Sequence, residues 1–468
     1  MLVPRDDHLL LLDAALADGD RAVDAWRRWR ASVDLDRIDG GSFRLLPLAV
    51  DNLDGRVDGD VAARVRGIAR YSWVATQKRL AAVEPVLHEL APAGIPVLLL
   101  KGSALVVAYG ADAARRAMHD LDIAVPSDRF DEAAAVLARS GFEVQAVDTS
   151  HEVWVAAQAL SFRQGPGVEV DLHRYVVSTW PQPGADDPIW QAARPAAVRS
   201  APCLVPCPAD LLFVIIEHAG RWNPTDSNVR WVADAVGLAR ATPVEWDRLV
   251  ELARRYRLAA TSAGALALLA DRWAVPIPED VVRRLERGAG RLWRIEERAR
   301  RVPEHARSPL HTAVATVGTS LRRSAPADRA VGAAAVAEAA RIAVGVARAR
   351  HVVPELLGRA AGSPAALADV RRSWRSRPAA SVPPGASATT WGGDAVQLLG
   401  FGWSAPEAVG TWTDGREADL HLPPVDGQAV LELSVRPFLC PGNELRVVEV
   451  QGGGRRLARL RFTGEPEW

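Results

Sequence analysis

Three aspartates stand at spacings that suit metal binding. Asp120 and Asp122 flank a leucine in Asp-Leu-Asp, and Asp171 lies in a later Val-Asp-Leu-His motif. Because alternate residues of a β-strand project to one side, Asp120 and Asp122 would present their carboxylates together. Such like charges repel unless a cation lies between them. Mg²⁺ or Mn²⁺ accepts these oxygen ligands, and three carboxylates can hold two ions about 4 Å apart.

A glycine turn shortly before the aspartate pair has the composition of a phosphate-binding loop. Lys101, Gly102 and Ser103 follow an apolar run, residues 95–100, that indicates a buried strand. Gly102 allows the backbone to approach a triphosphate, and Ser103 with the following helix N-terminus offers N–H donors. Arg116 precedes the aspartate pair and would neutralise negative charge. Together these residues predict a nucleoside triphosphate site.

The rarity of lysine in the chain draws attention to Lys101. Lys78 and Lys101 are the only lysines, and all other members of the 57 Lys and Arg residues are arginine. A compact ammonium beside a glycine turn can meet a phosphate. A solvated lysine at a strand end is the alternative, and we favour the functional interpretation.

Several other polar or aromatic residues are candidates with competing explanations. His173 follows Asp171 by two residues and so shares its strand face. It would be a base or an acceptor contact, or a structural histidine bonded to the aspartate, and the sequence leaves both open. For His218 and Asp234, packing and capping are the favoured roles. For Trp231, burial on an apolar helix face is simpler than stacking on a base.

Hydrophobic periodicity and turn signals predict the elements that position these residues. Residues 1–90 carry helical patterns, with one long helix over 61–90. A short helix is expected after Ser103, with this serine as its N-cap, and Ser127 would cap another over 128–140. Strands are predicted at 95–100, 121–125, 143–147, 153–163 and 168–176, with a hairpin turn between the last two. Further helices are predicted at 208–222, 227–241, 244–257, 259–273 and 278–301.

The order of the predicted helices and strands, together with shifts in composition, divides the 468 residues into five segments and predicts an α+β fold. We expect a mixed sheet flanked by helices, followed by a helical region and a small C-terminal β-sandwich. A stretch rich in Ser, Pro and Gly has linker composition. The predicted boundaries are 1–90 for an N-terminal helical segment, 91–205 for the core, 206–370 for the helical region, 371–390 for the linker and 391–468 for the sandwich.

Charge and cysteine content limit the partners and the compartment. Lys plus Arg and Asp plus Glu both number 57, so no global basic field attracts nucleic acid, which makes it an unlikely partner. The apolar runs are too short for a bilayer, and we expect neither a membrane span nor a secretory signal. Three cysteines fit a reducing cytosol rather than a disulfide framework. We therefore expect a cytoplasmic protein.

The motif order resembles the polymerase-β-type nucleotidyltransferase superfamily and, more narrowly, the bacterial family of uncharacterised nucleotidyltransferases. The likeness covers roughly residues 85–300. The gap from Ser103 to Asp120 is longer than in the commonest superfamily pattern. The matching residues are Leu100-Lys101-Gly102, Tyr109, Arg116, Asp120, Asp122 and Val170-Asp171-Leu172-His173, continued by His218, Trp231 and Asp234.

This resemblance implies an enzyme that moves a nucleoside monophosphate from an NTP, for example ATP, to a hydroxyl-bearing acceptor. By that likeness, Asp120, Asp122 and Asp171 would be catalytic metal ligands for Mg²⁺ or Mn²⁺. Gly102 and Ser103 would bind the triphosphate. The acceptor, whether small molecule, peptide or protein, does not follow from the family.

The C-terminal residues 401–415 resemble a β-sandwich module that is appended to bacterial glycosyltransferases and polysaccharide-assembly proteins. If exposed, Trp403 and Trp412 would stack on sugar rings, and the module would bind a glycan or a protein. We favour their burial in the sandwich core, because large aromatics dominate cores. By analogy alone, the module suggests a link to surface-polysaccharide or secondary-metabolite biosynthesis.

Two classes of function therefore compete. The first is the metal-dependent nucleotidyltransferase, in which the aspartates are indispensable. The alternative is a non-catalytic binding or regulatory protein that keeps the nucleotidyltransferase fold. A polynucleotide polymerase is disfavoured, because the chain lacks an obvious basic stripe.

Overall fold

The computed structural model describes most of the first 302 residues and a short C-terminal hairpin. The chain falls into two compact units, Met1–His421 and Leu422–Trp468. The predicted linker at 371–390 lies outside the described residues. The described residues are 4–35, 38–57, 59–118, 120–145, 158–165, 167–219 and 229–302, six positions between 311 and 321, and the backbone of 445–452 and 455–463.

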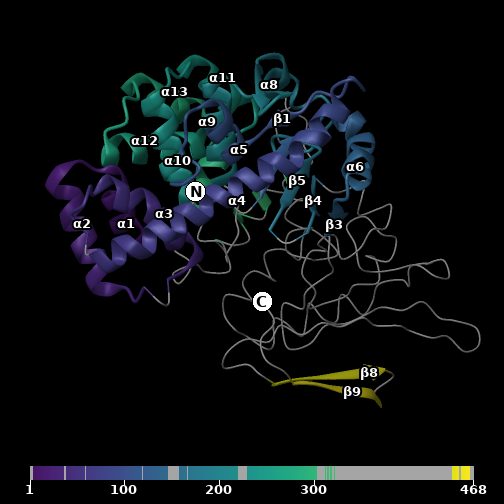
Figure 1. Ribbon diagram of the computed structural model, residues 1–468, viewed down its shortest axis with the longest axis horizontal. Coiled ribbons are helices and arrows are strands. Elements are labelled where there is room, and N and C mark those ends of the chain that lie inside the picture. The colour runs from purple at the N-terminus through teal and green to yellow at the C-terminus, as the bar shows by residue number, and fades with distance from the viewer. Residues whose placement is uncertain are drawn as a thin grey trace, which may run out of the picture. The chain divides into compact units, whose positions relative to one another are not determined.

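The N-terminal residues form helices, as predicted. Asp39 caps α3, because its carboxylate accepts the N–H groups of Gly41 and Ser42 at 2.8 and 3.1 Å. The 32-residue α4 packs against β5, β7 and α6 (Figure 1). These helices are α1 (Asp6–Leu16), α2 (Gly19–Ser32), α3 (Gly40–Asn52) and α4 (Gly59–Leu90).

The unit Met1–His421 contains a seven-stranded mixed sheet, in the order β3-β4-β5-β2-β1-β7-β6. The neighbours β2 and β5 run parallel, whereas β4 and β5 form the predicted antiparallel hairpin. The α+β prediction is therefore confirmed. The strands are β1 (Leu98–Leu99), β2 (Leu121–Ala124), β3 (Glu143–Val144), β4 (Ala159–Arg163), β5 (Glu169–His173), β6 (Arg194–Val198) and β7 (Ala201–Val205).

The register of the sheet sets three polar residues in a row. In the parallel pair, Asp122 of β2 lies opposite Asp171 of β5. In the adjoining antiparallel pair, Asp171 lies opposite Ser161 of β4. Their neighbours Leu121 and Ile123 are fully buried, as expected from the alternation of side chains along a strand. The sheet thus presents its polar residues on one face of three adjacent strands.

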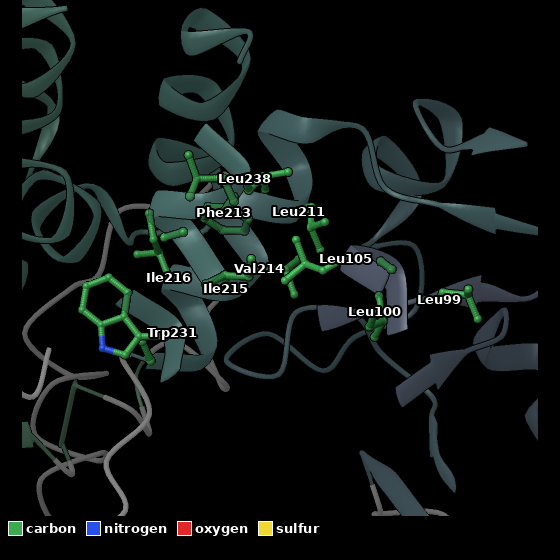
Figure 2. Packing of buried hydrophobic residues seen from close by; sticks show 14 of the residues in the cluster. Leu99, Leu100, Leu105, Leu211, Phe213, Val214, Ile215, Ile216, Trp231 and Leu238 are labelled. Carbon is green, nitrogen blue, oxygen red and sulfur yellow. The ribbon is translucent and has the colours of Figure 1, made fainter. Parts of the chain in front are cut away.

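The helix α5 (Lys101–Ala108) connects β1 to the loop before β2 and packs on the almost wholly buried α9 (Pro208–Ala219). Leu105 of α5 and Leu211 of α9 belong to the same apolar cluster (Figure 2). The hydroxyl of Tyr109, at the end of α5, donates to the carbonyl of Pro206 at 2.5 Å. The C-terminal end of α5, the helix that begins in the glycine turn, is therefore anchored to the segment that enters α9.

Two predictions about the secondary structure were wrong or incomplete. The expected single helix over 278–301 is two helices, because the backbone is extended at Ala289 and Gly290. The hairpin of β6 and β7 was not predicted, because Pro195 and Pro202 weaken its strand pattern. The remaining helices are η1 (Ser127–Arg129), α6 (Phe130–Arg139), α8 (Asp187–Gln191), α10 (Arg230–Ala241), α11 (Trp246–Arg255), α12 (Ala259–Trp273), α13 (Glu279–Gly288) and α14 (Arg291–Arg301).

The described part of the C-terminal unit is one antiparallel pair, β8 (Leu445–Gly452) with β9 (Arg455–Thr463). This pair lies within residues 391–468, where the β-sandwich was predicted. The rest of the predicted β-sandwich lies outside the described residues. Among the helices that the structure describes, none has the length and apolarity needed to cross a membrane.

The packing of the core predicts how a large-to-small substitution changes the free energy of unfolding. Phe213 of α9 is fully buried and stacks on Tyr256 with ring centroids 5.3 Å apart. We expect Phe213→Ala to lower the free energy of unfolding by about 3–5 kcal/mol, because it removes a large buried ring and leaves a cavity. Urea unfolding measures this change. The control Val74→Ala, at a position 37% exposed, should stay within about 0.5 kcal/mol of wild type.

Candidate active site

Asp122 is the centre of the candidate site and accepts two hydrogen bonds at one oxygen. Lys101 Nζ lies 2.6 Å and His173 Nε2 lies 2.9 Å from Asp122 Oδ1. Asp122 is only 5% exposed. Burial alone would raise the pKa of Asp122, but the Lys101 charge and the His173 hydrogen bond hold that pKa far below its usual range. Asp122 is therefore a carboxylate at neutral pH.

Lys101 reaches Asp122 through an unfavourable backbone conformation. Its φ is +46°, in the left-handed region that L-residues other than Gly, Asn and Asp seldom adopt. Such a conformation costs of order 1 kcal/mol and persists only where the surroundings enforce it. Here the ion pair with Asp122 supplies an opposing gain. The rare lysine of the chain thus has a specific, strained position beside an aspartate.

Asp171 is brought beside Asp122 by the parallel pairing of β2 and β5. The Ser161 hydroxyl donates to Asp171 Oδ1 at 2.6 Å from the next strand. Sequence reasoning missed Ser161. The predicted hairpin could have revealed this residue, because strand pairing across the turn places Ser161 opposite Asp171.

His173 shares the strand face of Asp171, but its described bond goes to Asp122 rather than to Asp171. The ring is 3% exposed. This contact fits a histidine that orients Asp122 and holds it ionised.

Asp120 has an electrostatic environment opposite to that of Asp122. Burial, followed by the charges of Asp122 and Asp171, raises the pKa of Asp120 to about 6, while Lys101 partly opposes this effect. A carboxyl among like charges resists ionisation until a cation offsets them. Burial therefore accounts for most of the rise in the pKa of Asp120, and repulsion by Asp122 and Asp171 adds to it.

The donor set fits a divalent cation. One ligand atom each from Asp122, Asp171 and His173 lies within 4.8 Å of the other two. Asp120 lies outside that group but is coupled to both aspartates by charge. Carboxylate oxygens are the ligands that Mg²⁺ and Mn²⁺ prefer, whereas an added imidazole favours softer ions. The carboxylates of Asp122 and Asp171 could hold one hard cation, with Asp120 as a further ligand, while the His173 ring bonds Asp122.

Ser103 does not have the position that its predicted capping role requires. The helix α5 begins at Lys101, and Leu100 is its N-cap. The Ser103 side chain is buried, and its hydroxyl lies 2.6 Å from the carbonyl oxygen of Leu100 and 2.8 Å from that of Asp122. The hydroxyl thus ties the start of α5 to β2. Backbone N–H groups of the first turn remain the groups that could meet a phosphate.

Gly102 makes room for Arg116. A Cβ atom at Gly102 would lie 1.9 Å from Arg116 Nη1, well inside contact distance. Arg116 itself is fixed by Asp234, which accepts from Nε at 3.0 Å and from Nη2 at 2.7 Å. This paired, two-bond geometry is the strongest form of an arginine–carboxylate contact. The guanidinium therefore lies against the start of α5 in one orientation.

Asp234 emerges as a positioning residue for this loop. It also receives Arg230 Nε at 3.4 Å, and Arg230 Nη1 donates to the carbonyl of Arg44 at 2.8 Å. Ser72 of α4 holds the same loop through the carbonyl of Ala113 at 2.8 Å. The predicted packing role of Asp234 therefore includes an ion pair with a candidate site residue. Trp231 is 4% exposed (Figure 2), in agreement with the apolar interpretation.

Comparison with known proteins supports a nucleotidyltransferase. Residues 44–274 match the family described as uncharacterised nucleotidyltransferase, and this stretch contains every residue of the candidate site. This match supports the assignment of the protein as a transferase. Members of such families use an NTP and a hydroxyl acceptor, generally with divalent metal ions. No curated protein matches the chain.

One similar solved structure is that of the antibiotic-resistance factor ANT(2'')-Ia. It shares 13% sequence identity, and the alignment covers 41% of this chain and 95% of that one, with a TM-score of 0.29. A score this low does not indicate a shared substrate or mechanism.

The close approach at Gly102 gives a testable consequence. We expect Gly102→Ala to displace the Arg116 guanidinium from Asp234 and to destabilise the protein by about 2–4 kcal/mol, because a buried ion pair is broken. Chemical denaturation measures the loss. Gly67→Ala on α4 is the matched control, since a Cβ there meets nothing within 4 Å. If Gly102→Ala proves as stable as Gly67→Ala, the described packing of Arg116 is incorrect.

The burial of Asp120 beside two other carboxylates predicts a pH-dependent stability of the metal-free protein. The pKa of Asp120 rises from 3.8 to about 6 on folding, so the folded state binds more protons in this interval and loses stability as pH increases through it. Above pH 7 we expect Asp120→Asn to be more stable than wild type by roughly 1–3 kcal/mol, and the difference to vanish below pH 4. Thermal melts in EDTA test this. Asp128→Asn, at an exposed position, is measured in parallel as a control. A less stable Asp120→Asn at pH 8 would contradict the description.

Proposed function

We propose that this protein is a metal-dependent nucleotidyltransferase that moves a nucleoside monophosphate from an NTP to a hydroxyl group of an acceptor. The observation that carries the proposal is the register of β2 and β5, which sets Asp122 beside Asp171. The raised pKa of Asp120 supports its membership of the same acidic set. The family match of this domain agrees with the proposal.

Asp120, Asp122 and Asp171 are the proposed ligands of Mg²⁺ or Mn²⁺. Bound ions would supply positive charge to the transferring phosphate and to both oxygens of the displacement. Within the protein, His173 fixes the orientation of Asp122 through its bond to Oδ1, and Ser161 does the same for Asp171. Such outer hydrogen bonds hold ligand oxygens in place before substrate arrives.

The triphosphate is proposed to lie at the start of α5. Lys101 adjoins this helix N-terminus and contacts Asp122 at 2.6 Å, so its ammonium can face carboxylate and phosphate together. The N–H groups of the first turn, including that of Gly102, would donate to phosphate oxygens. Ser103 acts from within, by holding the turn to β2. Arg116, fixed by Asp234, adds a stationary positive charge beside the turn.

In the proposed reaction, the acceptor hydroxyl oxygen attacks the α-phosphorus of the NTP. The bond between that phosphorus and the bridging oxygen to the β-phosphate breaks, pyrophosphate leaves, and the hydroxyl proton passes to solvent. Such transfers depend on positioning and charge stabilisation rather than on covalent chemistry by the protein. That requirement fits a site whose side chains are held in place by strand pairing and buried hydrogen bonds.

The identity of the acceptor and the wider role are also proposals. The resemblance of residues 401–415 to glycan-related modules suggests an acceptor in surface-polysaccharide or secondary-metabolite assembly, with a glycan or protein bound by the C-terminal unit. A cytoplasmic location suits an enzyme that uses NTPs and whose described cysteines, Cys203 and Cys207, are free and buried. ATP is the first NTP to try.

Activity measurements on three variants test this proposal. We expect Asp122→Asn and Asp171→Asn to lower pyrophosphate release from labelled NTPs in Mg²⁺ by at least about 100-fold, because each removes a ligand charge. Asp24→Asn on the surface of α2, whose side chain is 68% exposed, is the control and should keep full activity. A panel of hydroxyl acceptors accompanies each NTP. If wild type neither binds any NTP nor releases pyrophosphate, or if the two site variants match the control, the proposal fails.

A further inference from the structure

An arginine outside the site described above has two buried nitrogen atoms without a hydrogen-bond partner among the described residues. Arg79, on α4, is 5% exposed, and its Nε and Nη1 atoms are closed to water and have no hydrogen-bond partner among the described residues. A guanidinium has five N–H donors and ordinarily bonds them when buried. An uncompensated buried charge is costly. A ligand that accepts hydrogen bonds from Arg79 would offset this cost.

A second unsatisfied donor lies one turn earlier on the same helix. Thr76 is fully buried, and its Oγ1 also lacks a partner among the described residues. A helical threonine ordinarily donates to the carbonyl one turn back, and here it does not. Residues three apart on a helix lie on one face, so Thr76 and Arg79 offer their donors side by side.

This face of α4 lies against the end of the sheet where the site is built. Ser72, one turn before Thr76, bonds the carbonyl of Ala113 in the loop that leads to Asp120. The carboxylate whose charge acts most strongly on Arg79 is Asp120, and Glu169 acts more weakly. The residues that follow Asp120 and Glu169 are paired in register at the start of β2 and β5.

Neither neighbouring carboxylate satisfies Arg79. The Glu169 carboxylate accepts from Arg163 Nη2 at 2.6 Å through Oε1. Asp120 makes no ion pair with Arg79 among the described contacts. The Nε and Nη1 atoms of Arg79 are both closed to water. Charged hydrogen bonds are strongest in such surroundings.

We propose that Arg79 and Thr76 form an oxyanion subsite beside Asp120 that binds a phosphate group of a substrate. The role of this subsite rests on the proposed function, because a nucleotidyltransferase binds phosphate groups next to its aspartates. A planar guanidinium donates two parallel bonds to a phosphate, and the hydroxyl supplies a third. The bound phosphate belongs to the NTP or to a phosphorylated acceptor.

The experiment measures phosphate binding without catalysis. Inorganic phosphate, pyrophosphate and a non-hydrolysable ATP analogue are titrated calorimetrically into the full chain, the first two in EDTA. The variants are Arg79→Met and Arg79→Lys, and Arg70→Met at an exposed position of the same helix is the matched control. We expect Arg79→Met to bind phosphate or pyrophosphate about 10- to 100-fold more weakly than the control. Arg79→Lys keeps the charge but not the paired donors, and it should fall between them.

The two sources of the phosphate give different patterns, both of which support the subsite. A parallel loss of pyrophosphate and ATP-analogue affinity assigns it to the NTP. A loss of inorganic phosphate affinity with unchanged ATP-analogue binding assigns it to the acceptor.

Melting temperature in the absence of ligand separates a ligand group from a structural one. Because Arg79 is buried and unpaired, Arg79→Met should melt about 2–4 °C above wild type, whereas loss of a structural ion pair would lower the melting temperature. The inference is overturned if Arg79→Met binds both inorganic probes as tightly as Arg70→Met, or if it melts below wild type. Failure of the proposed transfer reaction would show as missing pyrophosphate release, while these binding and melting results would still decide the subsite.

Discussion

One buried carboxylate oxygen, Asp122 Oδ1, organises the site. It accepts a hydrogen bond from Lys101 and another from His173, which come from the glycine turn and from β5. These contacts keep Asp122 ionised although burial opposes its charge. They also join three separate segments of the chain at one atom. The turn, the aspartate strand and the later strand could not drift apart without leaving a charge buried and unpaired.

The other contacts of the domain hold the neighbouring site residues in place around Asp122 Oδ1. The parallel pairing of β2 with β5 delivers Asp171, and Ser103 ties the start of α5 to the backbone of Asp122. On the other side of the turn, Gly102 admits the guanidinium of Arg116, which Asp234 holds from α10. The cost of this arrangement is visible in the left-handed Lys101 and in the raised pKa of Asp120. Strain of this kind is typical of sites that bind charged ligands.

Much of the fold was predictable because its signals are local. The long helix ending at Leu90, the hairpin around Gly165 and the strand that begins at Leu121 follow from periodicity and turn residues. The aspartates were found for the same reason, since strand alternation alone aligns Asp120 with Asp122. The edge hairpin of β6 and β7 was missed, because its prolines hide a strand pattern that the neighbouring β1 stabilises.

Contacts between distant segments were beyond sequence reasoning. Nothing local shows that Arg116 meets Asp234 or that the Ser103 hydroxyl turns inward to the backbone of Asp122, because each contact depends on the packing of separate elements. The central claim is that the aspartates converge on a cation. Anomalous diffraction from crystals grown with Mn²⁺ and a non-hydrolysable NTP tests it most directly. We predict a peak about 2.0–2.4 Å from oxygens of both Asp122 and Asp171; a peak elsewhere, or none while Lys101 still contacts Asp122, would contradict the account.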